Sequence, residues 1–104
     1  MRQYELLTIF APQLGEEDLT NTIEQVTGYV TNNGGTISET LKDSPWGRRR
    51  LAYPIRYNSQ DVRDGFYVLY HFDAEPTSID TVDRALRLND RVLRHLIVKL
   101  GGEE

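Results

Sequence analysis

Three consecutive arginines, Arg48, Arg49 and Arg50, stand within the segment WGRRRLAYPI at residues 46–55. A guanidinium group is a planar fork of donors that can hold a phosphate bidentately and can stack on a base. Side chains alternate between the two sides of an extended chain. Arg48 and Arg50 are therefore expected on one side and Arg49 on the other, so the triplet cannot form one flat patch. A solvated run of cations without a ligand is the alternative interpretation.

The charge of the chain is unevenly distributed. The formal net charge is -4 and the isoelectric point is near 5.1, whereas nucleic-acid-binding domains are usually strongly basic. Residues 46–56 and 84–99 nevertheless carry a combined formal charge of +8, and the other 77 residues carry -12. Because charges are screened beyond about 8 Å at physiological salt, a partner responds to the local patch more than to the net charge.

No set of residues in the sequence assembles a catalytic or metal site. Cysteine is absent, which excludes a disulfide framework and a thiolate site. His71 and His95 are single residues without an Asp or Glu at ligand spacing, and the segment APQLGEE has no glycine-rich phosphate cradle. We therefore predict no enzyme activity, no metal and no cofactor.

The positions of apolar residues predict the elements that hold the arginines. Period-two alternation predicts a strand over residues 2–10, and apolar residues at spacings of three and four predict a helix over 16–33. An extended segment follows over 36–43, and RRRLAY could continue the same strand beyond a kink. A loop at 58–61, an aromatic strand over 65–72, a helix over 78–88 and a strand over 92–100 complete the chain.

The order strand, helix, strand, strand, helix, strand indicates the α+β class. Two such halves form a ferredoxin-like split β-α-β fold, a four-stranded antiparallel sheet with both helices on one face. The length predicts a single domain over residues 1–100 followed by a short acidic tail, 101–104. No segment reaches the roughly 20 apolar residues that span a bilayer, and the N-terminus does not resemble a signal peptide. We expect a cytoplasmic protein.

The predicted fold leaves one sheet face uncovered by helices. Alternation places Phe66, Val68, Tyr70 and Phe72 toward the core. The uncovered face then carries an apolar set: Leu7, Ile9, Tyr67 and Leu69. Such a face is too apolar for single-stranded RNA and indicates a protein-binding patch. We expect Leu69 to be solvent-facing in the free protein.

Three segments carry a resemblance to a known family: MRQYELLTIF, WGRRRLAYPI and LNDRVLRHLIVK. Over essentially its whole length the chain resembles the family of the sixth protein of the bacterial small ribosomal subunit. The resemblance implies a structural protein of the ribosome that binds the central domain of small-subunit ribosomal RNA. It also implies the eighteenth small-subunit protein as a partner. Because of the apolar set, we expect this partner to dock on the uncovered face or its edge.

The resemblance gives the basic residues a role. We expect two of the three arginines Arg48, Arg49 and Arg50 to contact RNA, without being able to say which two. At least one should serve the protein itself, over Trp46 or Tyr53 or beside an acid of the neighbouring strand. The first and last strands should be neighbours, so further RNA contacts are expected from their cations: Arg2, Arg91, Arg94 and Lys99.

A second hypothesis belongs to a different functional class. The acidic isoelectric point and the half-apolar sheet face also allow a ferredoxin-like regulatory module. Such a module would dimerise through its open face and sense a small molecule. Cosedimentation with small ribosomal subunits distinguishes the two hypotheses.

Overall fold

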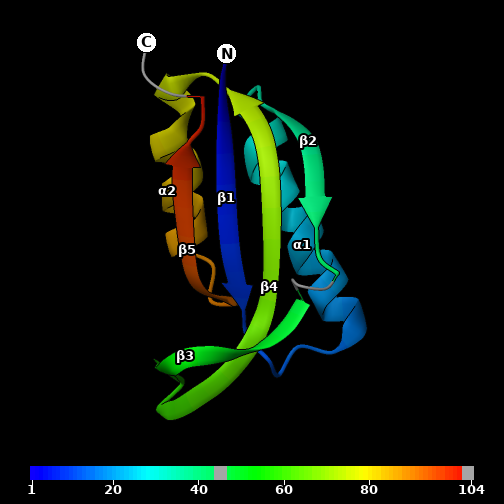
Figure 1. Ribbon diagram of the computed structural model, residues 1–104, viewed down its shortest axis with the longest axis vertical. Coiled ribbons are helices and arrows are strands. Elements are labelled where there is room, and N and C mark those ends of the chain that lie inside the picture. The colour runs from blue at the N-terminus through cyan, green and yellow to red at the C-terminus, as the bar shows by residue number, and fades with distance from the viewer. Residues whose placement is uncertain (44–46, 102–104) are drawn as a thin grey trace.

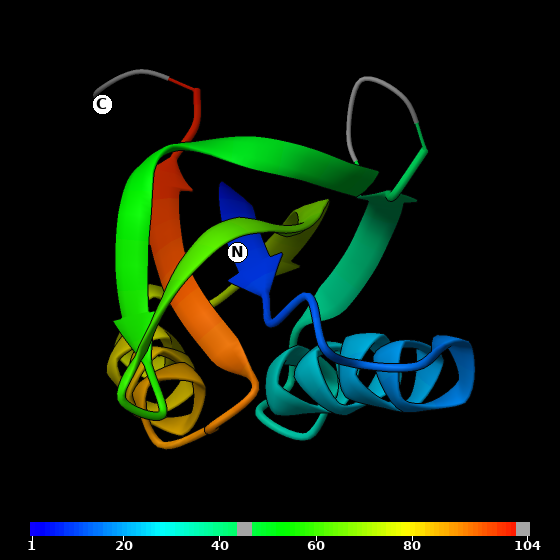
Figure 2. The same ribbon diagram turned by 90° about the horizontal axis from the view of Figure 1, so that it is seen from below.

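The computed structural model describes residues 1–43 and 47–101. The elements follow in the order β1 (Arg2–Phe10), α1 (Glu16–Thr31), β2 (Thr36–Leu41), β3 (Gly47–Tyr57), β4 (Gln60–Ala74), a short 3-10 turn (Pro76–Ser78), α2 (Ile79–Arg87) and β5 (Val92–Lys99). The sheet order is β2-β4-β1-β5, and every described pairing is antiparallel. Both helices cover the same face (Figures 1 and 2). The predicted ferredoxin-like fold is confirmed, and we call the face without helices the open face.

The edge of β4 carries two strands where the sequence suggested one. β2 pairs with residues 69–73 of β4, and β3 pairs farther along the same edge with residues 60–67. The sheet therefore has five strands instead of four. Residues 44–46, which include Trp46, lie outside the described part of the chain, as do residues 102–104 of the predicted tail.

The β3–β4 hairpin, formed by β3 and residues 60–67 of β4, is the main departure from the predicted elements. The strand predicted over 65–72 begins at Gln60 and spans 15 residues. Asn58 and Ser59 both have positive φ, 52° and 66°, the backbone of a two-residue hairpin turn. The hairpin extends past the ends of β1 and β5 at one end of the molecule (Figure 1).

The helices end slightly earlier than the periodicity predicted. α1 stops at Thr31 instead of residue 33, and α2 spans 79–87 instead of 78–88. At the end of α1, Gly34 takes a φ of 87°, and the Gly35 amide donates to the Val30 carbonyl at 2.9 Å. This hydrogen bond satisfies a carbonyl at the helix end, and the positive φ of Gly34 turns the chain toward β2.

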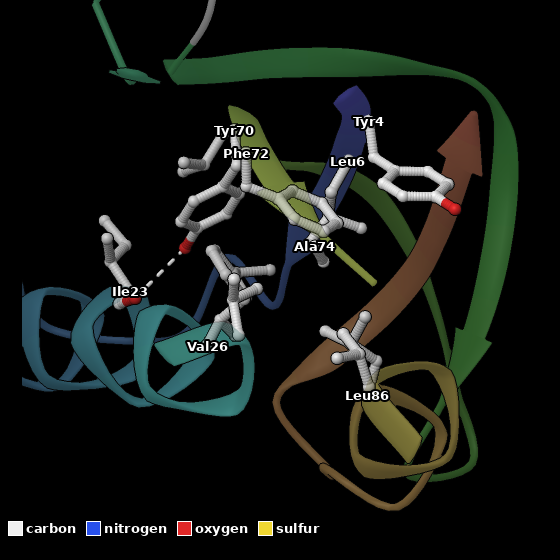
Figure 3. Packing of buried hydrophobic residues seen from close by; sticks show 12 residues of the cluster. Tyr4, Leu6, Ile23, Val26, Tyr70, Phe72, Ala74 and Leu86 are labelled. Atoms are coloured by element: carbon white, nitrogen blue, oxygen red, sulfur yellow. Dashed lines mark hydrogen bonds between the residues drawn. The ribbon is translucent and has the colours of Figure 1, made fainter. Parts of the chain in front are cut away.

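The main core lies between the sheet and the two helices. Alternation in β1 and β4 was predicted correctly, since Leu6, Val68, Tyr70 and Phe72 are buried against α1 and α2 (Figure 3). The Tyr70 hydroxyl donates to the Ile23 carbonyl at 3.1 Å. This hydrogen bond gives the buried Tyr70 hydroxyl the partner that it would otherwise find in water. Burial also raises the pKa of Tyr70.

A second hydrophobic cluster forms inside the hairpin, on the open face. Its buried members are Leu51, Ile55 and Val62, and it packs against Ile9, Tyr57, Tyr67 and Leu93. We call this the hairpin cluster. β4 approaches β1 closely at Gly65, where an added Cβ would meet Ile9 Cγ2 at 2.7 Å and the Phe10 carbonyl at 3.0 Å. Glycine at this position lets the hairpin leave the sheet and curl over its open face.

Candidate functional site

The hairpin fixes the sides on which the three arginines lie. Arg48 pairs with Phe66, Arg49 with Gly65, and Arg50 with Asp64. The Arg48 guanidinium lies over the Phe66 ring at 5.2 Å, on the helix side, and Arg49 lies over Tyr67 at 5.2 Å, on the open-face side. The predicted placement of Arg48 and Arg49 on opposite sides is therefore confirmed.

Arg48 is the arginine that serves the protein itself. Its Nε donates to Asp64 Oδ2 at 3.1 Å, and a terminal nitrogen lies 3.0 Å from the same oxygen. Its other terminal nitrogen donates to the Pro12 carbonyl at 3.3 Å, which ties the hairpin to the loop after β1. The prediction of an arginine beside an acid of the neighbouring strand is confirmed.

Arg50 has a different environment from Arg48. Arg50 is exposed, and its guanidinium has no hydrogen bond or ion pair with any residue that the structure describes. The exposed Arg63 of β4 shares this property. The two line a shallow cavity of about 290 Å³ together with Arg48, Arg49 and Asp64. Arg63 was missed in the sequence because it stands between Asp61 and Asp64, where local charges cancel.

Arg91, in the turn before β5, and Arg94 of β5 lie on different faces. Arg91 donates to the Thr22 hydroxyl of α1 at 3.3 Å, on the helix side. Arg94 lies over the Tyr53 ring at 5.7 Å, where the hairpin meets the open face. Arg94 therefore joins the surface that carries Arg49, whereas the Arg91 guanidinium is engaged elsewhere.

Arg2 and Lys99 lie at the other end of the sheet. Arg2 pairs with Ala74, and Lys99 pairs with Tyr4. Arg48 pairs with Phe66, eight positions before Ala74 on β4, a separation of roughly 26 Å along a strand. The structure does not bring the seven predicted RNA-binding residues into one site.

The predicted protein-binding residues share the open face but differ in exposure. Leu7 pairs with Leu69, and Ile9 pairs with Tyr67. Leu69 is 7% exposed, so the expectation that it faces solvent is wrong. Leu7 and Leu41 flank Leu69 on the neighbouring strands.

The hairpin cluster covers another part of the predicted patch. Ile9 and Tyr67 pack against its buried members and are half-buried. Apolar side chains that remain exposed on the open face belong to β5: Leu96 is 58% exposed and Val98 is 39% exposed. Both were missed, although their pairing opposite Leu7 and Glu5 follows once β5 lies beside β1.

A row of three polar side chains crosses the open face. His71 of β4 lies between two carboxylates, with Nε2 3.1 Å from Glu5 Oε2 and Nδ1 3.2 Å from Glu39 Oε1. The hydrogen bond with Glu5, aided by Glu39 and opposed by partial burial, raises the pKa of His71 above its usual 6.5. Sequence spacing missed these carboxylates because strand register supplies both.

His95 also has a carboxylate partner that the sequence did not reveal. Its Nε2 lies 2.7 Å from Asp83 Oδ1 of α2. This hydrogen bond lowers the pKa of Asp83. Arg87 lowers it further, and partial burial opposes the shift. In residues 1–43 and 47–101, no group of three or more His, Asp or Glu side chains has an arrangement that could hold a metal ion. Within the same ranges, no helix has the length and apolar character to cross a membrane.

The comparisons with known proteins agree with the resemblance of the three segments. Residues 3–99 match the family described as Ribosomal protein S6. The small ribosomal subunit protein bS6 of Desulforamulus reducens is 38% identical over 101 residues, which cover 97% of this chain and 99% of that protein. The crystal structure of 30S ribosomal protein S6 from Thermotoga maritima has a TM-score of 0.84 at 23% identity, and the match covers 95% of this chain and 87% of that one.

The structural match shows the fold, and the sequence matches show the family. The predicted family is therefore confirmed: this chain belongs to the ribosomal protein S6 family, and it is a component of the small ribosomal subunit in the cytoplasm and not an enzyme.

Proposed function

We propose that this chain binds the central domain of small-subunit ribosomal RNA through its β3–β4 hairpin, together with the eighteenth small-subunit protein. The observation that carries the RNA contact is a concentration of uncompensated arginines. Arg49, Arg50 and Arg63 lie in one hairpin without an ion pair to any residue of the described ranges. A chain of net charge -4 thus presents a local cationic surface to the RNA backbone.

The contacts of the triplet favour two of its members as RNA contacts. Arg48 is held by Asp64 and the Pro12 carbonyl, so its donors are largely occupied. Arg49 keeps its guanidinium donors while it stacks on Tyr67, and Arg50 is exposed. Arg49 and Arg50 are therefore the proposed RNA contacts, and Arg48 stabilises the hairpin.

The remaining predicted cations take separate places in this proposal. Arg94 extends the Arg49 surface because it stacks on Tyr53 at the same side of the hairpin. Arg91 borders this end of the molecule from the helix side. Arg2 and Lys99 would contact a different RNA segment, since they lie at the far end of the sheet.

We assign the partner protein to the part of the open face that the hairpin leaves uncovered. Leu96 and Val98 are exposed there beside the half-buried Leu7. Glu5 lies opposite Val98 beside this strip, and Glu39 lies beyond His71 on the same face. These carboxylates favour a partner with basic side chains near its apolar contact. Leu69 would support the strip from within the sheet and would not itself be the anchor.

The test is the salt dependence of binding to a central-domain RNA fragment in the presence of the partner protein. Each phosphate neutralised contributes about 0.7 to 0.9 to the slope of log affinity against log salt. Changing Arg49 and Arg50 together to Ser should flatten the slope by roughly 1.4 to 1.8 when each contacts its own phosphate, and by less where another arginine shares a phosphate. Arg84→Ser on α2 is the matched control, because that exposed arginine lies on the helix side. An unchanged slope in the double variant would refute the hairpin as the RNA contact.

Cosedimentation tests the partner assignment and the regulatory alternative. The chain should sediment with small ribosomal subunits, and Leu96→Asp should weaken its association with the partner. If the isolated chain forms a dimer that Leu96→Asp disrupts, the open face is a self-association surface, as the regulatory-module hypothesis requires.

A further inference from the structure

Arg50 and Arg63 are brought together by an irregularity in the hairpin. Arg50 pairs with Asp64, and the next pairing is between Ile55 and Val62. The four residues 51–54 therefore stand opposite the single residue Arg63. An insertion of this kind bends the strand and changes the direction of its side chains. Arg63 has no strand partner in the β3–β4 register, and it borders a cavity together with the inserted segment.

Two adjoining cavities show that the two arginines border the same space. The cavity of about 290 Å³ is lined by both, with Arg48, Arg49 and Asp64. A smaller cavity of about 70 Å³ is lined by Arg50, Arg63 and the inserted residues 51–54. Arg50 and Arg63 are the two residues charged at neutral pH that line both cavities.

The nearby carboxylates do not compensate these two charges. Asp64 forms its ion pair with Arg48 at 3.0 Å, and Asp61 forms one with Arg56 at 3.3 Å. The guanidinium groups of Arg50 and Arg63 have no hydrogen bond or ion pair with the described residues. Two like charges that border one cavity repel each other, and an anion between them removes this repulsion. A phosphate offers oxygens to both guanidinium groups at once.

We propose that Arg50 and Arg63 together bind one phosphodiester group of the RNA backbone. This inference rests on the proposed RNA-binding function and adds a contact from a residue outside both basic segments of the sequence. Arg48 supports the site indirectly, because its ion pair prevents Asp64 from neutralising Arg50. The two arginines would contact the phosphate and no base, so their contribution to affinity should be independent of RNA sequence.

The test compares Arg50→Gln, Arg63→Gln and the double variant in binding to the central-domain RNA with the partner protein. Each single variant should weaken binding by about tenfold, because a charge-assisted hydrogen bond is lost. A shared phosphate predicts that the double variant flattens the salt slope by about 0.7 to 0.9, the value for one phosphate. The losses should also be less than additive, as expected for residues that contact one group.

Three outcomes would overturn the inference. A slope change of about 1.4 to 1.8 in the double variant, with additive losses, would assign two separate phosphates. Unchanged affinity in Arg63→Gln would remove Arg63 from the contact, and the proposed function would survive if Arg49→Gln still weakened binding. If none of these variants changed affinity, both the inference and the hairpin contact would fail.

An NMR titration, first with inorganic phosphate and then with the RNA, distinguishes a phosphodiester site from a site for a free phosphate ion. The Nε–H signals of Arg50 and Arg63 are followed by NMR as inorganic phosphate replaces chloride at constant ionic strength. The RNA assignment predicts weak, non-saturating shifts, and strong shifts when the RNA is added. Saturation by inorganic phosphate below about 1 mM would identify a free-phosphate site instead. Arg84→Gln serves as the charge-matched control in the RNA titrations.

Discussion

The Arg48 guanidinium lies 3.0 Å from the carboxylate of Asp64 on the neighbouring strand. This ion pair separates the triplet into one structural arginine and two arginines available to a ligand. It also joins β3 to β4 next to Gly65, where the hairpin leaves the sheet. Stability and RNA binding should therefore respond differently to changes at adjacent positions.

Arg48→Ala should lower the free energy of unfolding by about 1 kcal/mol, from an exposed ion pair and a cation–π contact. Arg50→Ala should change it by less than about 0.5 kcal/mol, because its exposed side chain has no hydrogen bond or ion pair with the described residues. Urea denaturation of both variants measures the difference. Equal stability losses would contradict the division of roles within the triplet.

Leu69→Asp should destabilise the fold by about 3 kcal/mol or more. Leu69 is 7% exposed between Leu7 and Leu41, and a carboxylate there loses its hydration without gaining a partner. Leu96→Asp is the matched control on the same face: it should leave stability nearly unchanged and weaken association with the partner. Native stability in Leu69→Asp would contradict the burial of this side chain.

Gly65→Ala should destabilise the protein by about 1 to 3 kcal/mol and weaken RNA binding through displacement of the hairpin. The new methyl would lie 2.7 Å from Ile9 Cγ2 and 3.0 Å from the Phe10 carbonyl oxygen, and a backbone atom of a central strand cannot move aside easily. Gly15→Ala, with no heavy atom within 4 Å of the new Cβ, should be nearly neutral. Thermal unfolding and RNA titration compare the two variants.

The pKa of His71 predicts a pH dependence of stability. Its pKa is raised on folding, chiefly by the hydrogen bond with Glu5, so the folded state binds the proton more tightly. The stabilisation is complete below the unfolded pKa of about 6.5 and disappears as pH rises through the folded pKa. Wild-type stability should thus fall more than that of His71→Gln between about pH 5.5 and about pH 8.

NMR titration of the imidazole provides the direct check. Glu5→Gln should move the pKa of His71 downward, because the first cause of the shift is removed. A larger decrease in Glu39→Gln than in Glu5→Gln would contradict the order of the two contributions.

Local patterns were sufficient to predict the layers of the fold. The alternation of Leu6, Val68, Tyr70 and Phe72 identifies the buried side of two central strands, since strand side chains have a period of two. The same rule separated Arg49 from Arg48. Each of these predictions depends on neighbours within one strand, and such relations are present in the sequence itself.

Relations between strands were not predictable in this way. The carboxylates beside His71 come from β1 and β2 and depend on the register of three strands. The burial of Tyr67 and Ile9 depends on the curl of a hairpin whose turn, Asn58-Ser59, contains no glycine. Arg63 borders the same cavities as Arg50, where residues 51–54 stand opposite one position. Each relation follows from pairings that single-strand periodicity does not contain.

The stacking of Arg49 on Tyr67 and of Arg94 on Tyr53 has a further consequence for binding. An arginine side chain that becomes fixed loses rotamer entropy worth roughly 1.5 to 2 kcal/mol. The two tyrosine rings restrict these side chains before any ligand arrives, so less freedom remains to be lost on association. Tyr67 is itself held by the hairpin cluster. A small hydrophobic core far from the helices would in this way increase the affinity of a polar surface without touching the RNA.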